Sequence, residues 1–182
     1  MPLPKTTQMR TSLRWKQKKT SRSKNRRETE MAGKAADAVK LIRSWNGYSE
    51  SNGKADRFII KPWDKWVGRK LTSKTPWCQI TCSSCLHQSG VTTTKTSGCL
   101  QAVNYYKSKK RWKKKTVKPC VGYQCFYDFK GKGKPTHTGL VTAVSGNIVT
   151  VYEGNKSNKV GARKFNYKTY KYLYGWGSPA YK

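Results

Sequence analysis

Apolar residues recur at helical spacing in the first half of this chain. Ala35, Ala38, Ile42 and Trp45 form one such series, and Asn46-Gly47 follows it directly. An Asn-Gly pair after the last apolar position is a common helix stop, because both residues tolerate a left-handed backbone. We therefore expect an amphipathic helix here.

The next stretch, residues 47–74, has no clear period of this kind. We expect a loop or short helical turns, with Phe58, Trp63 and Trp66 as apolar anchors. A second helix with periodic apolar positions is expected over Gly98–Lys107.

Between these segments, Thr75-Pro76 supplies a hydroxyl N-cap and a proline at the first helical position, where its missing N–H costs nothing. Gly90 stands where a C-cap belongs, so we expect a helix over Pro76–Ser89. The inward face of that helix is expected to hold Cys82, Cys85, Leu86 and Ser89.

After Pro119 the period changes from helical to alternating, which is typical of β-strands. Ser145-Gly146-Asn147 predicts a turn between two of them. Helices followed by an antiparallel sheet indicate an α+β domain, with N-terminal helices packed on five or six strands. The expected strands are Gln124–Phe129, His137–Val144, Asn147–Glu153, Arg163–Tyr167 and Tyr170–Trp176.

The 182 residues divide into an N-terminal arm and a domain, and both are basic. Residues 1–31 are polar and basic, and we expect a disordered arm; residues 32–182 are expected to form one domain. The formal net charge is +31, and the chain after its first thirty residues keeps 29 basic and 6 acidic residues, or +23. Such charge predicts attraction to polyanions: nucleic acid, anionic wall polymers or an anionic membrane surface.

Neither a membrane-spanning segment nor a secretory signal is recognisable in the sequence. We therefore expect synthesis in the cytoplasm of a host cell without a signal peptide. In a reducing compartment the six cysteines are expected to be thiols or metal ligands before disulfides.

Three of these cysteines, Cys78, Cys82 and Cys85, fall within PWCQITCSSC. The C-x3-C-x2-C spacing is associated with radical-SAM iron–sulfur sites, and on a helix the three share one face. Ser84, however, stands where that motif usually has an aromatic residue, and no second pair completes a zinc site. We expect no metal and no cofactor, with Cys82 and Cys85 as small buried residues.

Cys78 differs because it falls in the first turn of the expected helix. Free backbone N–H groups and the helix dipole favour an anion there and lower the pKa of a thiol. His87 lies nine residues along the same helix and is expected to be a surface or capping residue. His137 opens a hairpin in which we expect it to stand opposite Glu153, close enough for the carboxylate to orient the imidazole. These residues predict a nucleophile, a base and an orienting acid; a structural histidine is the alternative.

Five motifs occur in this order along the chain: Trp45-Asn46-Gly47-Tyr48-Ser49-Glu50, Trp77-Cys78, His137-Thr138-Gly139-Leu140-Val141, Glu153-Gly154-Asn155 and Tyr174-Gly175-Trp176-Gly177-Ser178-Pro179. Together they resemble the CHAP family of cysteine, histidine-dependent amidohydrolases/peptidases, common in bacteriophage endolysins and bacterial cell-wall hydrolases.

The resemblance implies a papain-like fold and cleavage of an amide bond in peptidoglycan, by an N-acetylmuramoyl-L-alanine amidase or a cross-bridge endopeptidase. Cys78 matches the nucleophile, His137 the base, Glu153 the group that orients it, and Asn155 a polar residue near the site. Val121-Gly122-Tyr123 stands where members often carry Pro-Gly-Asp. The acidic calcium loop of some members is also missing, so no calcium is expected.

A basic run, KSKKRWKKKTVK, offers a surface for polyanions. We expect the protein to be a monomer that acts at the cell wall after release, or within a virion, and to hold anionic wall polymers through this run. Two rival readings are a basic nucleic-acid-binding protein and a virion structural protein with a hydrolase-like fold. The residues of the run expected to take part are Lys109, Lys110, Arg111, Lys113, Lys114 and Lys115.

Overall fold

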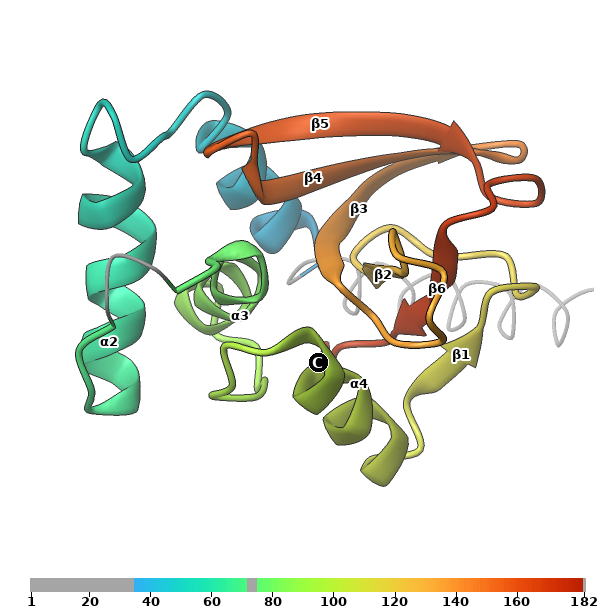
Figure 1. The fold of residues 1–182 in the computed structure, drawn as a ribbon, viewed down its shortest axis with the longest axis horizontal. Coiled ribbons are helices and arrows are strands. Elements are labelled where there is room, and N and C mark those ends of the chain that lie inside the picture. The colour runs from blue at the N-terminus through green and yellow to red at the C-terminus, as the bar shows by residue number, and fades with distance from the viewer. Residues whose placement is uncertain (1–34, 72–74, 182) are drawn as a thin grey trace, which may run out of the picture.

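The computed structural model describes residues 35–71 and 75–181 and shows an α+β protein, as predicted. Helices lie against a strongly curved antiparallel sheet (Figure 1). The expected basic arm, residues 1–31, lies outside the described residues. Within them, no helix is both long and apolar enough to cross a membrane.

Residues 47–74 contain more helix than expected. Residues 54–67 are one continuous helix with a π-helical turn inside it, so the prediction of a loop or short turns was wrong. Ala55, Ile59 and Trp63, four residues apart, are fully buried, whereas Phe58 is 38 % exposed and is no buried anchor. The helices are the segment 35–44, η1 (Asp56–Ile60), α2 (Lys61–Val67), α3 (Cys78–Gln88) and α4 (Cys99–Ser108).

The start of α3 differs from the prediction by two residues. Trp77 is the N-cap and Cys78 the first helical residue, so the prediction that Thr75 is the N-cap and Pro76 the first helical residue was wrong. Cys78 is therefore closer to the start of the helix than predicted. Gly90 has the positive φ of 70° that suits a helix terminus.

Six strands form one sheet in the order β1-β6-β2-β3-β4-β5, and every neighbouring pair is antiparallel. The first of them was not predicted, because it falls within the basic run. The strands are β1 (Trp112–Lys114), β2 (Gln124–Tyr127), β3 (His137–Ser145), β4 (Ile148–Lys156), β5 (Lys159–Asn166) and β6 (Leu173–Gly177).

The register of the β3–β4 hairpin is shifted by two positions from the prediction. Leu140 pairs with Tyr152 and Val141 with Val151, and an irregularity follows before Ala143. His137 and Glu153 are therefore not directly opposed, and that part of the prediction was wrong. Continuing the observed register places Glu153 opposite a glycine, Gly139.

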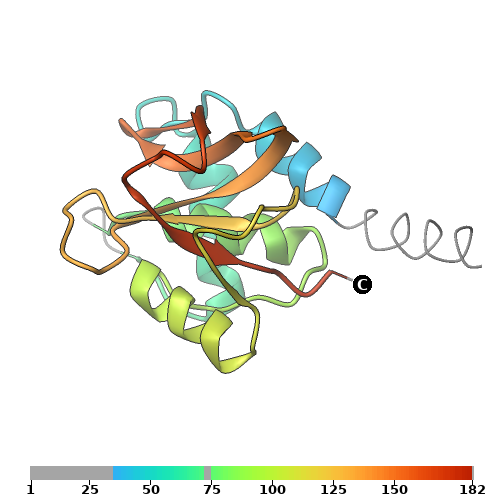
Figure 2. The same ribbon diagram turned by 90° about the vertical axis from the view of Figure 1, so that its right-hand side faces the viewer.

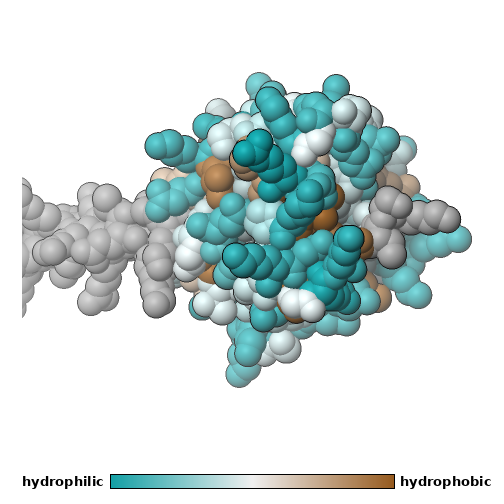
Figure 3. Space-filling view, turned by 90° about the vertical axis from the view of Figure 1, so that its left-hand side faces the viewer, coloured by the Kyte–Doolittle hydropathy of each residue, from teal (hydrophilic) through white to brown (hydrophobic). Residues whose placement is uncertain are grey.

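Apolar side chains pack on both faces of the sheet. One cluster joins the helix 35–44, α2 and α3 to β3 and β5, and includes Ile42, Trp63 and Leu140. A second, on the opposite face, contains Val141 and Trp176. Figure 2 shows α3 and α4 against the same side of the sheet. The outer side over α2 is mainly hydrophilic, with apolar side chains exposed only in small separate areas (Figure 3).

Candidate active site

Cys78 is the first residue of α3, and its side chain is only 4 % exposed. The hydrogen bond from Thr81 N–H to Trp77 C=O is the first of the helix, so the N–H groups of the three residues before Thr81 have no helical acceptor. The Trp77 indole donates a hydrogen bond of 2.8 Å to Glu50 Oε1, which ties this helix start to the segment before η1.

Buried amide and hydroxyl groups connect α3 to the sheet. The Gln124 side-chain amide in β2 donates to Gln79 Oε1, at 2.7 Å, and to Thr138 Oγ1, at 2.9 Å. Gly154 lies in β4, two strands from β2 in the sheet. A Cβ added at Gly154 would lie 1.8 Å from Thr81 Oγ1, so only glycine lets α3 pack this closely on β4. Helix and sheet therefore meet beside Cys78.

His137 Nε2 lies 3.2 Å from Glu153 Oε2, although the two residues are not directly opposed. The contact exists because Gly139 has no side chain: a Cβ there would lie 2.7 Å from Glu153 Cγ. Glu153 fills this space and reaches diagonally to the imidazole. The predicted contact is thus present, through a different register.

Arg163 in β5 holds the other side of the same carboxylate. Its Nε donates to Glu153 Oε1 at 2.6 Å and its Nη2 to Oε2 at 3.1 Å, while Nη1 donates to the Tyr170 hydroxyl at 3.3 Å. The Glu153 side chain is fully buried. Burial raises the pKa of its carboxyl, but hydrogen bonds from His137 and Arg163 outweigh this and lower the pKa, so it stays ionised.

Arg163 was missed in the sequence. Nothing in the sequence links it to Glu153, because the β4–β5 register that brings them together was not predicted. The only hint was that an acid buried in so basic a chain needs a cationic partner.

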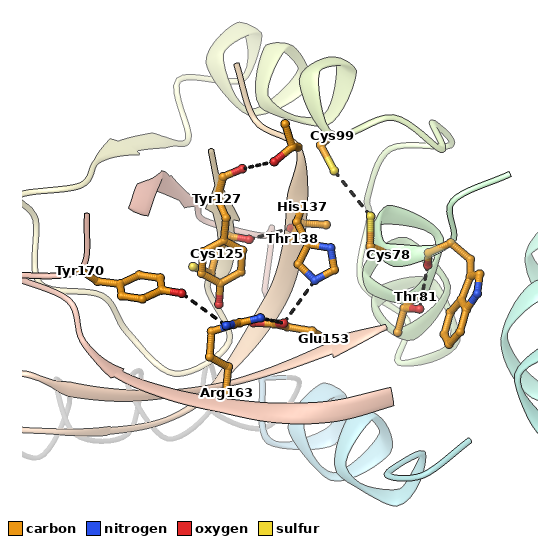
Figure 4. A network of polar contacts seen from close by, with 12 residues as sticks. Cys78, Thr81, Cys99, Cys125, Tyr127, His137, Thr138, Glu153, Arg163 and Tyr170 are labelled. Carbon is orange, nitrogen blue, oxygen red and sulfur yellow. Dashed lines mark hydrogen bonds and ion pairs between the residues drawn. The ribbon is translucent and has the colours of Figure 1, made fainter. Parts of the chain in front are cut away.

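The imidazole of His137 lies between Glu153 and Cys78, with one ring nitrogen facing each (Figure 4). Burial lowers the pKa of His137, but hydrogen bonds to Cys78 and Glu153 outweigh this effect and raise the pKa to about 9. The pKa of Cys78 falls to about 5, because a hydrogen bond to Cys99 and interactions with His137 outweigh burial. Between these pH values the pair is a thiolate and an imidazolium.

Cys99 is the second residue that the sequence did not single out. It is the first residue of α4, and its Sγ lies 3.8 Å from Cys78 Sγ. All six cysteines are free.

Asn155, the fourth predicted site residue, lies in β4 beyond Glu153. Its φ of +55° is in the left-handed region, where asparagine is among the favoured residues, so the backbone alone accounts for its type. Within the described residues its side chain makes no hydrogen bond, and nothing connects it to the imidazole.

Cys82, Cys85 and His87 lie where the sequence predicts them. Cys82 and Cys85 are fully buried, and desolvation raises the pKa of both thiols. His87 is exposed and stacks on Trp66 with ring centroids 4.0 Å apart. Among the described residues no group of three or more side chains could hold a metal ion.

No family model matches this chain, and no curated protein matches it. What the site can do therefore follows from its own residues. A thiolate at a helix start, an imidazolium beside it and a carboxylate that orients the imidazole are the kinds of group that cysteine hydrolases use for acyl transfer.

Proposed function

We propose that this protein is a cysteine hydrolase of papain-like architecture that cleaves an amide bond in bacterial peptidoglycan, as an amidase or cross-bridge endopeptidase. The observation that carries the proposal is the contact of Cys78, at the start of α3, with His137, which Glu153 orients at 3.2 Å. The ordered motifs that resemble the CHAP family point to peptidoglycan as the substrate.

In the first half of the reaction the Cys78 thiolate attacks the amide carbonyl carbon. The oxyanion that forms accepts hydrogen bonds from free N–H groups at the start of α3, where the helix dipole also favours negative charge. The His137 imidazolium gives its proton to the leaving amine, and a thioester remains on Cys78.

In the second half, neutral His137 accepts a proton from water, which attacks the thioester. The acid product leaves, and the thiolate–imidazolium pair is restored. Glu153 keeps the ring in place through both halves, and Arg163 keeps Glu153 ionised.

Mass spectrometry of purified walls after digestion tests this function. Wild-type protein is expected to expose new amino termini or to release free stem peptides, and these products identify the bond that is cut. Cys78→Ala is expected to release none, whereas Cys120→Ala, which changes an exposed cysteine, is expected to match the wild type. Identical fragments from Cys78→Ala and wild-type protein would contradict the proposed function.

Two adjoining hollows beside β1 and the segment before β6 support a second role, retention on anionic wall polymers. They measure about 540 and 440 Å³ and share Lys115, Thr116 and Lys171. Lys114 lines the first and Lys168 the second. No carboxylate in the described part of the chain forms an ion pair with any of these four lysines.

The one acid in the hollows is already engaged. Asp128 accepts backbone N–H groups of its own loop, from Lys130 at 3.2 Å and Gly133 at 2.7 Å. Together the hollows bring four lysines to one surface, and several cations in a row suit a chain of phosphates better than a single small anion.

This surface differs in part from the basic run seen in the sequence. Of the predicted residues, only Lys114 and Lys115 line the hollows. Arg111 instead donates a hydrogen bond of 3.0 Å to Pro179 C=O and holds the C-terminal segment. Lys168 and Lys171 come from the turn between β5 and β6, over fifty residues away in sequence.

Pelleting with walls tests retention, using Cys78→Ala protein so that hydrolysis does not interfere. Changing Lys114, Lys115, Lys168 and Lys171 to Gln is expected to weaken pelleting on intact walls, with little effect on walls stripped of anionic polymer. Lys61→Gln and Lys95→Gln, outside the hollows, serve as controls. Equal pelleting of all variants, or a preference for DNA over wall polymer, would contradict this role.

A further inference from the structure

Two helix N-termini meet at two sulfur atoms. Cys78 begins α3 and Cys99 begins α4, and their Sγ atoms are 3.8 Å apart (Figure 4). The N–H groups of the first turn and the dipoles of both helices favour a negative charge at this place.

Among the described residues, only one of the two sulfurs has a cationic partner. The titratable groups that face Cys78 are Cys99 from α4, Cys82 from its own helix and His137 from β3, with Glu153 and Arg163 behind the imidazole. Of these, only His137 interacts with Cys78 as a cation.

This asymmetry decides which sulfur holds the proton. The hydrogen bond to Cys78, together with burial, raises the pKa of Cys99, so Cys99 remains a thiol. The pair then consists of one thiolate acceptor and one S–H donor.

We propose that Cys99 is a positioning residue for the nucleophile: its S–H donates a hydrogen bond to the Cys78 thiolate and holds the sulfur beside His137. The catalytic meaning of this contact rests on the proposed hydrolase function. The ionisation of Cys78 does not, because it can be measured without any substrate.

The competing role for Cys99 is packing alone. It belongs to a buried cluster with Ala102, Val103, Tyr106 and Phe126. A residue that only fills space can be replaced by another apolar residue without changing the ionisation of Cys78, whereas a hydrogen-bond donor cannot.

Alkylation of Cys78 by iodoacetamide as a function of pH separates the two roles. A small reagent suits a side chain that is 4 % exposed, and peptide mass spectrometry separates Cys78 from exposed Cys120. We expect the wild-type rate to rise with a midpoint near 5. Cys99→Ala is expected to raise the midpoint by about one pH unit or more, the effect of losing one hydrogen bond to a charged group.

Two further variants control for structure. Val103→Ala removes more volume from the same cluster but no donor, and is expected to leave the midpoint unchanged. Cys99→Ser keeps a donor and is expected to stay closer to the wild type than Cys99→Ala. If Cys99→Ala does not fold, Cys99→Val fills the site without a donor, and its midpoint must rise. An unchanged midpoint in a folded Cys99→Ala or Cys99→Val protein overturns the proposal.

The outcome is distinguishable from failure of the proposed function. If walls are not digested but the midpoint shifts in Cys99→Ala, the proposed role of Cys99 is supported and peptidoglycan is not the substrate. If walls are digested and the midpoint does not shift, the proposed hydrolase function is supported and Cys99 is a packing residue.

Discussion

At the scale of single residues, the site is a chain of charges in which each group sets the state of the next. Arg163 holds Glu153 as an anion, Glu153 stabilises the His137 cation, and His137 together with Cys99 stabilises the Cys78 anion. A buried charge is costly without a partner, so the loss of one group is felt by the others.

The coupled ionisation of Cys78 and His137 predicts a bell-shaped pH profile. As the pH falls through about 5 the Cys78 thiolate is protonated, and as it rises through about 9 the His137 imidazolium loses its proton. We expect kcat/KM on soluble wall fragments to rise and fall near these values, which belong to the pair. A single limb, or a maximum below pH 5, would contradict the assignment.

Removing Arg163 leaves buried Glu153 with His137 as its one charged partner in the part of the chain that the structure describes. Arg163→Ala is expected to cost about 3 kcal/mol, which for a protein of this size lowers Tm by about 6–12 °C. Wall digestion should also slow, because the imidazole loses its fixed support. Lys164→Ala, next in the strand and exposed, is the control. Unchanged Tm and rate in Arg163→Ala would show that the ion pair contributes nothing.

The closeness of the two sulfurs predicts a reversible disulfide under peroxide. The Cys78 thiolate attacks hydrogen peroxide to give a sulfenic acid and hydroxide, and the Cys99 thiol then displaces water to form the bond. We expect a mass loss of two hydrogens, a linked Cys78–Cys99 peptide, and activity that dithiothreitol restores. Cys99→Ser should instead lose activity irreversibly at high peroxide. Recovery of Cys99→Ser by dithiothreitol would argue against this exchange.

At the scale of elements, the site depends on how closely α3 lies against the β3–β4 hairpin. Two glycines permit this: Gly139 makes room for the Glu153 side chain, and Gly154 makes room for Thr81, one turn after Cys78. The periods of the helices and strands were readable in the sequence. The two-residue register shift was not, because either register leaves the same alternation of buried and exposed positions.

A methyl group at Gly154 should therefore separate helix and hairpin. We expect Gly154→Ala to destabilise the protein by about 1–3 kcal/mol through overpacking. It should also slow wall digestion on the order of 100-fold, because the nucleophile moves away from its base. Gly161→Ala is the control, since an added Cβ there meets only the Lys156 side chain, at 3.9 Å. Thermal unfolding and wall digestion check both; equal behaviour of the two variants would refute this role of Gly154.

At the scale of the whole molecule, positive charge is spread over the domain and also gathers on one surface. The hollows bring together lysines from β1 and from the turn before β6. Composition predicted a polyanionic partner, but it could not place the surface, because charge in a sequence does not say which side chains share a face.

This charge predicts salt-sensitive retention on walls. Each lysine that neutralises a phosphate releases bound counterions, so retention should fall steeply as salt rises. A chain that starts at Met31 keeps +23 of the +31 and should show a shallower dependence on salt. Co-sedimentation of Cys78→Ala protein with walls at increasing sodium chloride measures both slopes. Equal, flat slopes would show that charge does not hold the protein.

The sequence by itself determined the class of fold, the position of Cys78 near a helix start, and the presence of His137 and Glu153 in one hairpin, though not in the right register. These follow from local periods and caps, which act over a few residues. Only the tertiary structure decided the true register, the arginine behind Glu153 and the second sulfur beside Cys78. The two side-chain contacts join residues ten and twenty-one positions apart, and they depend on which elements pack together rather than on any local pattern.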